Sequence, residues 1–375
     1  MLPYGRQSID ESDIAAVTEA LRSDWLTTGP EVARFESAVA ARAGVEHAVS
    51  VTSGTAALHV AYAAAEITPG DEVVTTPLTF VATAATAALY GATIRFADVD
   101  PRTGNIDPSA AESEVTDRTR VVAGVDYAGV PVDAPALRDL ASRKGLLFLE
   151  DAAHSIGSTL NGKPVGALAD LTTYSFFPTK NLTTAEGGAV VTADPELAAR
   201  ARAFKNHGLV RDRDRQRFPD EGPWHQEVHT FGLNYRLPDL LCALGTSQLA
   251  RLDSFVARRA EIKHIYDEAL RDLDGVDVPY APDGAVPAWH LYPLRVPAER
   301  RRVIFESLRE QGIGVQVNYI PAYWHPVFED LGYKRGMCPV AEDYYRREIS
   351  LPMFPGLTDA DVERVIEATR RAVQG

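Results

Sequence analysis

The sequence contains little cysteine and no long hydrophobic run. Its two cysteines, Cys242 and Cys338, lie far apart among 375 residues and have no CxxC spacing. Neither a disulfide framework nor a zinc cluster of the usual cysteine spacing is therefore suggested. No run of about 18 apolar residues occurs, and the N-terminal stretch has no apolar signal-peptide core. We expect a cytoplasmic protein without a membrane span.

Positive charge is also scarce. The chain has 38 lysines and arginines against 52 aspartates and glutamates, which gives a formal net charge of -14. This balance provides no basic field for nucleic acid, and an anionic substrate would need a local positive site. We expect a small-molecule partner.

A nicotinamide-binding enzyme is disfavoured as well, because the first strand runs into VTSGTAAL without a GxGxxG turn.

Short apolar runs alternate with helical patterns over the first 245 residues, which indicates βαβ units and a mostly parallel sheet. Ser8 and Glu11 have the spacing of a capping box, which predicts a helix start there. Helices are predicted over 55–66, 80–91 and 133–145. Seven strands are predicted, at residues 47–51, 72–76, 93–99, 120–126, 145–151, 172–177 and 188–192.

The pattern changes after residue 245. A long connecting helix is predicted over 246–273; the apolar stretch 290–296 follows it, and then come a helix near 299–312, a strand at 315–320 and a helix after 357. We therefore expect a large α/β domain at 1–245 and a smaller α+β domain at 246–375. Ligands of such proteins bind at the carboxyl ends of the strands and near the domain boundary.

Two of the predicted strand ends carry polar residues. The sequence Ser53-Gly54-Thr55 joins a strand directly to a helix, so free backbone N–H groups there suit a phosphate, although these residues could simply cap the helix. Asp151 ends another strand, and His154 follows it. The carboxylate could orient an imidazole, hold a proton on a heterocyclic nitrogen, or cap the next helix. A metal site is the least supported, because no second ligand cluster is nearby.

A third strand end precedes Lys180. Phe176, Phe177 and Pro178 come just before this lysine, and an apolar enclosure lowers a lysine's pKa and makes the amine nucleophilic. Taken alone, a lysine after a strand is usually a surface residue. A phosphate anchor, a strand-end aspartate and an enclosed lysine are together what pyridoxal 5'-phosphate (PLP) requires.

Several stretches, in this order and spacing, resemble a known family: SGTAAL, TPLTF, EDAAHSIG, SFFPTKNLTTAEGG, NHG and GLNYRLPD. They look like the DegT-type PLP-dependent nucleotide-sugar aminotransferases of fold type I, and the resemblance covers nearly the whole chain. It implies a mixed, mostly parallel seven-stranded sheet. TGNID, VDYAG, TTAEGGAVVT and AEDYYRREISLP are most similar to 4-aminotransferases that act on UDP-linked 4-keto-6-deoxy hexosamines.

Carried over residue by residue, the resemblance assigns the catalytic roles. Lys180 would form the Schiff base with PLP and move the proton, and Asp151 would pair with the pyridinium nitrogen. His154 would sit near the ring hydroxyl, and Phe80 would stack on the ring. Close relatives that remove a hydroxyl group have histidine in place of this lysine, so Lys180 indicates transamination.

The resemblance also assigns the phosphate site. Gly54, Thr55 and Ser175 would bind the phosphate, with Ala56 in the same cofactor-binding turn. Asn234 would reach this phosphate from the neighbouring subunit, which implies a homodimer with shared active sites. The expected reaction moves the amino group of L-glutamate to a nucleotide-linked keto sugar. The alternatives are another ring position, a dTDP- or GDP-linked sugar, or an aminocyclitol of antibiotic biosynthesis.

Substrate residues are predicted in two segments. Tyr319, Tyr323 and His325 match a substrate loop of the family, although these aromatics could instead pack the small domain. Arg211 opens a run of arginines in 209–232 that could contact a diphosphate or the glutamate carboxylates. Interleaved acidic residues make a solvated loop the alternative for that run.

Overall fold

The computed structural model describes residues 1–375, and its centre is a seven-stranded sheet. The strand order is β1-β9-β8-β5-β4-β2-β3. β2 pairs in parallel with β3 and β4, β4 with β5, and β5 with β8, whereas β9 is antiparallel to both neighbours. The predicted fold class is confirmed, and all seven predicted strands are present: β1 His47–Val51, β2 Glu72–Thr75, β3 Thr93–Phe96, β4 Thr119–Val125, β5 Leu147–Asp151, β8 Leu171–Ser175 and β9 Gly188–Thr192.

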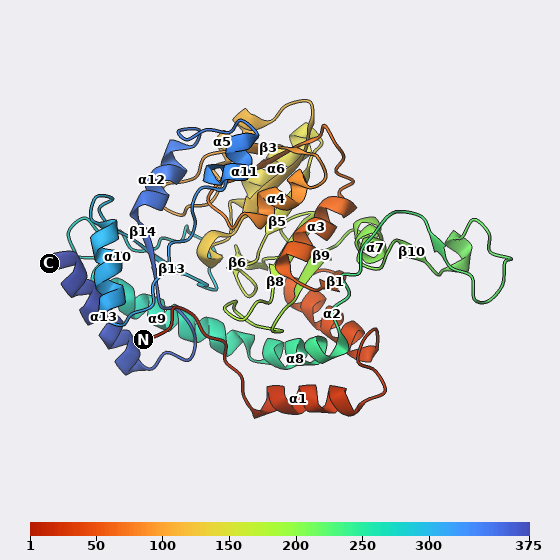
Figure 1. Ribbon diagram of the computed structural model, residues 1–375, viewed down its shortest axis with the longest axis horizontal. Helices are drawn as coiled ribbons and strands as arrows, with labels where there is room; N and C mark the ends of the chain where they lie inside the picture. Colours follow the sequence, from red (N-terminus) through yellow and green to blue (C-terminus); the bar gives the residue numbers. More distant parts are fainter.

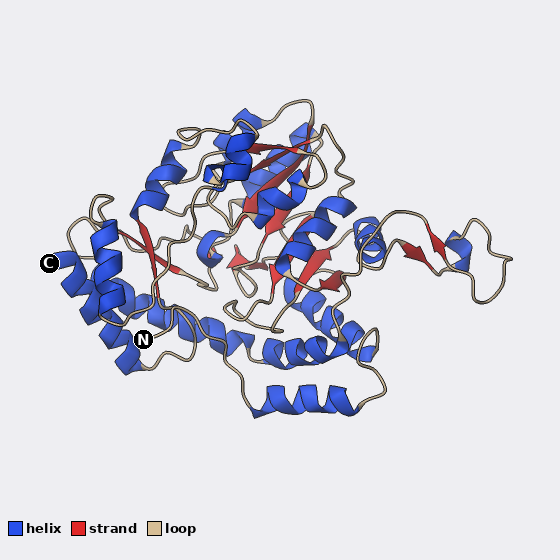
Figure 2. Cartoon of the chain, viewed as in Figure 1, coloured by secondary structure: helices blue, strands red, loops and turns tan.

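Helices cover both faces of this sheet (Figures 1 and 2). The three helices predicted between the strands are present as α3, α4 and α6, with ends shifted by one to three residues. The helices of the large α/β part are α1 Glu11–Arg22, α2 Pro30–Ala43, α3 Gly54–Ala64, α4 Ala82–Ala88, α5 Pro108–Glu114, α6 Ala134–Lys144, α7 Pro195–Phe204 and α8 Asp239–Ala250.

Successive side chains of the central strands face opposite sides of the sheet, which produces two hydrophobic cores. Val73 and Val121 pack with α3, α4 and α7 on one face, while their neighbours Val74 and Val122 pack with α2, α5 and α6 on the other. Successive side chains of a strand point to opposite faces, so strands buried on both sides are apolar at every position. The same alternation sends Asp151 to the face of α3 and α4.

The C-terminal part has a core of its own. Its members run from Ile262 to Val373, and Leu2 from the N-terminus joins them. The predicted helix near 299–312 and the predicted final helix are present, and the apolar stretch 290–296 contains a strand. The elements are α9 Leu252–Leu270, β13 Tyr292–Arg295, α10 Arg301–Glu310, α11 Pro326–Asp330, α12 Pro339–Arg347, β14 Glu348–Leu351 and α13 Asp359–Gln374. The domain boundary near residue 245 stays a prediction.

The predicted long helix over 246–273 is two helices. α8 ends at Ala250 and α9 begins at Leu252, with Arg251 between them at a φ of -104° and a ψ of -2°. Its guanidinium pairs with Asp10 at 2.8 Å and with Asp13 of α1. Figure 1 shows α8 and α9 running below the sheet toward the C-terminal helices.

Two further local predictions were wrong. The capping box of α1 is formed by Asp10 and Asp13 rather than by Ser8 and Glu11, because the helix begins at Glu11 and Asp10 is therefore its N-cap. The stretch 315–320 is not a strand. Only Gln316 forms a bridge to Ser350 of β14, because the next amide in position to pair, that of residue 318, is bonded to a carboxylate instead.

Residues 205–236 form an arm that projects from the large part of the molecule (green, right side of Figure 1). Its ribbon contains β10 Leu209–Val210 and β11 Glu227–Val228, which pair antiparallel. The large apolar side chains of Trp224 and Phe231 are 80% and 97% exposed.

Three short strands elsewhere in the chain pair with one another: β6 Thr159–Leu160, β7 Lys163–Pro164 and β12 Ala285–Val286. No helix in the chain combines the length and apolar character needed to cross a membrane.

Candidate active site

A cavity of about 650 Å³ lies at the carboxyl ends of the parallel strands. β4, β5 and β8 run in the same direction, so Val125, Asp151 and Ser175 at their ends meet at one edge of the sheet. The first turn of α3 closes one side, and segments from the N-terminus and the C-terminal part close the other. Such an edge is where open α/β sheets bind their ligands.

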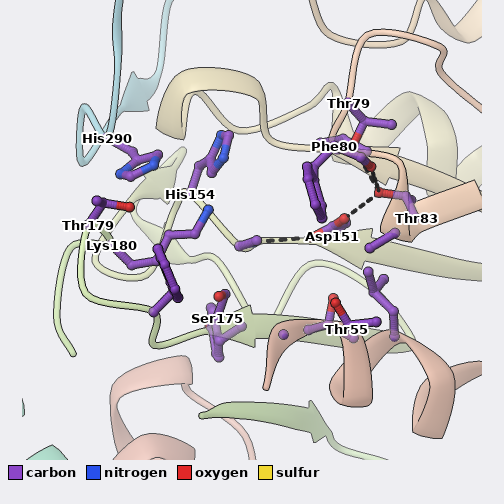
Figure 3. A pocket seen from close by; sticks show the side chains of 18 of the residues that line it. Thr55, Thr79, Phe80, Thr83, Asp151, His154, Ser175, Thr179, Lys180 and His290 are labelled. Carbon is purple, nitrogen blue, oxygen red and sulfur yellow. Dashed lines mark hydrogen bonds between the residues drawn. The ribbon is translucent and has the colours of Figure 1, made fainter. Parts of the chain in front are cut away.

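Asp151 and Lys180 face each other across this cavity (Figure 3). The buried Asp151 carboxylate accepts hydrogen bonds from Thr83 Oγ1 at 2.7 Å and from the Ala153 amide at 3.2 Å. Burial raises the pKa of Asp151, while these hydrogen bonds and the Lys180 charge oppose the rise. Burial also lowers the pKa of Lys180 to about 8, and Asp151 opposes that change. A fraction of the Lys180 amine is therefore neutral near pH 7.

His154 forms the centre of an aromatic stack. Its Nε2 lies 3.1 Å from the Tyr319 hydroxyl, and the His290 ring packs on it with a centroid separation of 4.4 Å. Burial and the Lys180 charge lower the pKa of His154 well below its ordinary value, so the imidazole is neutral at physiological pH. Its Nδ1 is buried and has no partner in the protein.

The N-terminus of α3 offers backbone donors to the cavity. Ser53 caps the helix by accepting from the Ala56 amide at 3.0 Å, whereas the amides of Gly54 and Thr55 donate to no protein group. A Cβ on Gly54 would lie 2.7 Å from the Ser175 Cβ. Only glycine permits this close approach, which leaves two free N–H groups and the Ser175 hydroxyl side by side at the positive end of a helix.

The structure brings eight of the predicted site residues to the cavity: Gly54, Thr55, Phe80, Asp151, His154, Ser175, Lys180 and Tyr319. The Phe80 side chain is 59% exposed and packs edge-on against Tyr319, with the ring centroids 6.2 Å apart. It therefore covers the mouth of the cavity. Ala56 is buried one residue behind the free amides.

Four predicted residues lie elsewhere. Tyr323 is fully buried, and its hydroxyl bonds to Glu342 at 2.7 Å. His325 lines a separate cavity of about 260 Å³ on the outer side of Phe80 and Tyr319. Arg211 and Asn234 are both exposed on the arm and do not line the main cavity of this chain.

Thr83, Tyr4 and His290 are among the cavity residues that the sequence analysis did not identify. Thr83, which holds Asp151, does have a local signal, because it follows Thr79 by one helical turn and both hydroxyls line the cavity. Tyr4 and His290 have none. They come from the N-terminus and from the segment before β13, and only the packing of the C-terminal part brings them to the sheet edge.

A mixed seven-stranded sheet with an enclosed lysine, a buried aspartate and a free helix N-terminus at its edge defines an enzyme that binds PLP in the manner of fold type I. Comparison with known proteins then identifies the family. The chain belongs to the DegT/DnrJ/EryC1/StrS aminotransferase family, whose model matches residues 7–370. The protein is thus a PLP-dependent sugar aminotransferase, as expected from the motifs.

Individual relatives are similar along their full length. The spore coat polysaccharide biosynthesis protein SpsC of Bacillus subtilis is 42% identical over 380 residues, which cover 100% of this chain and 97% of SpsC. Helicobacter pylori PseC, an aminotransferase involved in the biosynthesis of pseudoaminic acid, has a TM-score of 0.93 at 33% identity, covering 100% and 99% of the two chains. Streptococcus pneumoniae Spr1654, solved in a PLP form, has a TM-score of 0.93 at 28% identity and coverage of 100% and 98%.

Proposed function

We propose that the protein transfers the amino group of L-glutamate to C4 of a nucleotide-linked 4-keto-6-deoxy sugar. The observation that carries the transfer chemistry is the cavity in which Lys180 faces Asp151 beside the free N-terminus of α3. The likeness to PseC over the whole chain, at 33% identity, supports a keto sugar of this kind as the acceptor.

The cavity residues fit PLP. A phosphate needs anion donors, which the Gly54 and Thr55 amides and the Ser175 hydroxyl would provide at the positive end of α3. A pyridine nitrogen that carries a proton needs a carboxylate, and Asp151 lies buried in the same cavity. The exposed Phe80 ring would cover the cofactor ring.

Lys180 Nζ would move the proton. When bound, PLP supplies an electron sink for the charge that develops on the amino-bearing carbon. The lowered pKa of Lys180, about 8, lets Nζ accept a proton from that carbon and return it near neutral pH. One lysine can therefore serve both half-reactions.

Asp151 and His154 would set the electrostatics around the cofactor. Thr83 and the Ala153 amide hold the carboxylate of Asp151 in place, so its negative charge favours a protonated ring nitrogen. His154 stays neutral and is held by Tyr319, which places a hydrogen-bonding imidazole edge in the cavity without adding a second positive charge. Tyr319 and Phe80 together reduce the access of water.

We also propose that two copies of the chain share their active sites. The arm exposes large apolar side chains, and Asn234 at its base is exposed and does not line the cavity of its own chain. In the proposed dimer, Asn234 of one copy donates to the phosphate held by α3 of the other. This arrangement gives an isologous interface with two composite sites.

The acceptor is tested with a panel of UDP-, dTDP- and GDP-linked 4-keto sugars, each with L-glutamate, by following the release of 2-oxoglutarate. The proposal expects turnover with a 4-keto-6-deoxy sugar and a product aminated at C4. Turnover confined to a ketocyclitol, or amination at another ring carbon, would replace the proposed acceptor. No turnover with any nucleotide-linked sugar would refute it.

A further inference from the structure

Arg259 of α9 is a buried cation without an acidic partner. Its side chain is 1% exposed, and Nη1 donates to the carbonyls of Trp289, His290 and Met353 at 3.3, 3.1 and 2.8 Å. Nε is buried and unpaired. A buried charge that lacks a counter-charge is costly, so its presence calls for an anion nearby.

The Arg259 guanidinium lies directly behind one wall of the active-site cavity. It bonds to the backbone of His290, which lines the cavity, and Met353, another of its acceptors, donates its amide to the carbonyl of Tyr4 at 3.2 Å. Tyr4 also lines the cavity. Figure 3 shows His290 on the side of His154 that is turned away from Asp151. The buried cation therefore marks the end of the cavity opposite the proposed ring-nitrogen site.

Tyr4 presents a free O–H group at this end. Its oxygen accepts a hydrogen bond from Asn318 Nδ2 at 2.8 Å, and its proton has no acceptor in the protein. Asn318 is itself held on several sides, because its amide donates to Glu348 at 2.7 Å, its Nδ2 also donates to Ser350 at 3.0 Å, and its carbonyl accepts from Tyr127. The position of the Tyr4 phenol is thus set before a ligand arrives.

His290 offers a second donor. Its Nδ1 is buried without a partner, and its Nε2 makes no hydrogen bond to the protein. A buried N–H without an acceptor costs more than a bare ring nitrogen, so the proton belongs on Nε2. Burial lowers the pKa of His290 well below its ordinary value, and the nearby His154, Lys180 and Arg259 lower it further, so the ring donates as a neutral imidazole.

No arginine of this chain lines the cavity, although an amino-acid donor must bring a carboxylate into it. We infer that Tyr4 Oη and His290 Nε2 bind the α-carboxylate of the amino donor, and that the buried charge of Arg259 stabilises it through the intervening wall. Arg259 is a positioning residue in this scheme, since it does not touch the substrate. The inference rests on the proposed amino-acid half-reaction and deepens it.

The test follows the glutamate half-reaction of the PLP-loaded enzyme by absorbance, without any sugar present. Tyr4→Phe removes one hydrogen bond to a carboxylate, so the glutamate concentration that gives half-maximal rate should rise about tenfold. The KM of the variant for the keto sugar, measured at saturating glutamate, should stay at the wild-type value. Tyr280→Phe, which removes a phenol remote from the cavity, serves as the matched control and should change neither value.

Arg259→Gln tests the buried charge itself. This substitution should raise the glutamate concentration that gives half-maximal rate without altering the KM for the keto sugar. A thermal melt shows whether the variant folds. If the Arg259 variant does not fold, the double variant of Tyr4→Phe with His290→Phe replaces it, because both positions keep a ring. The double variant should raise the glutamate concentration for half-maximal rate more than either single change does.

Three results would overturn the inference. They are an unchanged glutamate dependence in Tyr4→Phe, an equal loss for glutamate and sugar, and a glutamate-specific loss found instead in Arg211→Ala of the arm. Failure of the sugar assignment leaves this half-reaction intact. If the wild type does not react with L-glutamate, the proposed donor is wrong, and the amino acid that does react is used in the same comparison.

Discussion

The cavity wall and the arm represent two opposite ways of presenting functional residues. Asp151 and His154 are 4% and 6% exposed, and each is held by a neighbour of the same chain, whereas Phe231 and Trp224 of the arm are 97% and 80% exposed. The sheet and its helices set the geometry of the wall during folding. The arm holds these side chains in solvent, and in the proposed dimer they would meet a second copy. Substitutions in the cavity wall should therefore alter the chemistry within one chain, whereas substitutions in the arm should act on the site of a partner copy.

The largest effect is expected at the centre of the wall. Lys180→Ala removes the amine that would bond to PLP and move the proton, so turnover should fall about 10³-fold or more. The absorbance of the PLP-reconstituted protein should also lose the band of the covalently bound cofactor. Lys163→Ala, at an exposed lysine, is the control and should leave both unchanged. A variant at Lys180 that keeps wild-type turnover would contradict the proposed chemistry.

Asp151→Asn should produce the next largest loss. It keeps the size of the side chain but removes the charge that would stabilise a protonated ring nitrogen, and turnover should fall about 10²-fold. Thr83→Val, which removes one hydrogen bond to the same carboxylate, should cause a smaller loss. Equal effects from the two changes would show that the charge of Asp151 is not what matters.

Asn234→Asp tests whether the arm completes the site of a partner. It places a negative charge beside the proposed phosphate and should weaken PLP binding in the dimer. Mixing this variant with Lys180→Ala should then restore about a quarter of the wild-type turnover, since half of the dimers are mixed and each has one intact site. No recovery, or a monomer in analytical ultracentrifugation, would show that each chain works alone.

A pH series sharpens the description of the wall. The pKa of Lys180 is lowered to about 8, so the neutral amine becomes more abundant as the pH rises toward this value. Capture of PLP by the cofactor-free protein should therefore accelerate with increasing pH and level off above about 8. A rate that keeps rising toward the ordinary lysine range would mean that the cavity does not enclose the amine.

The smallest effect on catalysis is expected at Tyr323. The structure places this side chain in the core, where its hydroxyl donates to Glu342 at 2.7 Å and accepts from the Cys338 amide at 3.1 Å. Tyr323→Phe should lower the free energy of unfolding by ~1 to 2 kcal/mol in a denaturant titration and leave both substrate KM values unchanged. A clear rise in the sugar KM would restore Tyr323 as a substrate residue.

The local pattern of apolar residues was sufficient to predict the strands of the sheet and the polar residues at their ends. Seven apolar runs predicted the seven strands, because a strand buried on both faces is apolar at consecutive positions. Asp151, Ser175 and Gly54 follow directly from those strands, and parallel neighbours bring their carboxyl ends to the same edge. The helix break at Arg251 was missed because arginine is a good helix former, and the Asp10 and Asp13 carboxylates that Arg251 pairs with lie about 240 positions earlier in the chain.

The amino-acid sequence by itself therefore determined the fold class, the family and the residues at the strand ends, since each of these is written in short, contiguous segments. Only the tertiary structure decided which distant segments complete the cavity. Tyr4, His290 and the buried Arg259 meet there because the N-terminus and the C-terminal part share one core. That packing depends on the free energy of contacts between remote parts of the chain, for which no local spacing of residues provides a signal.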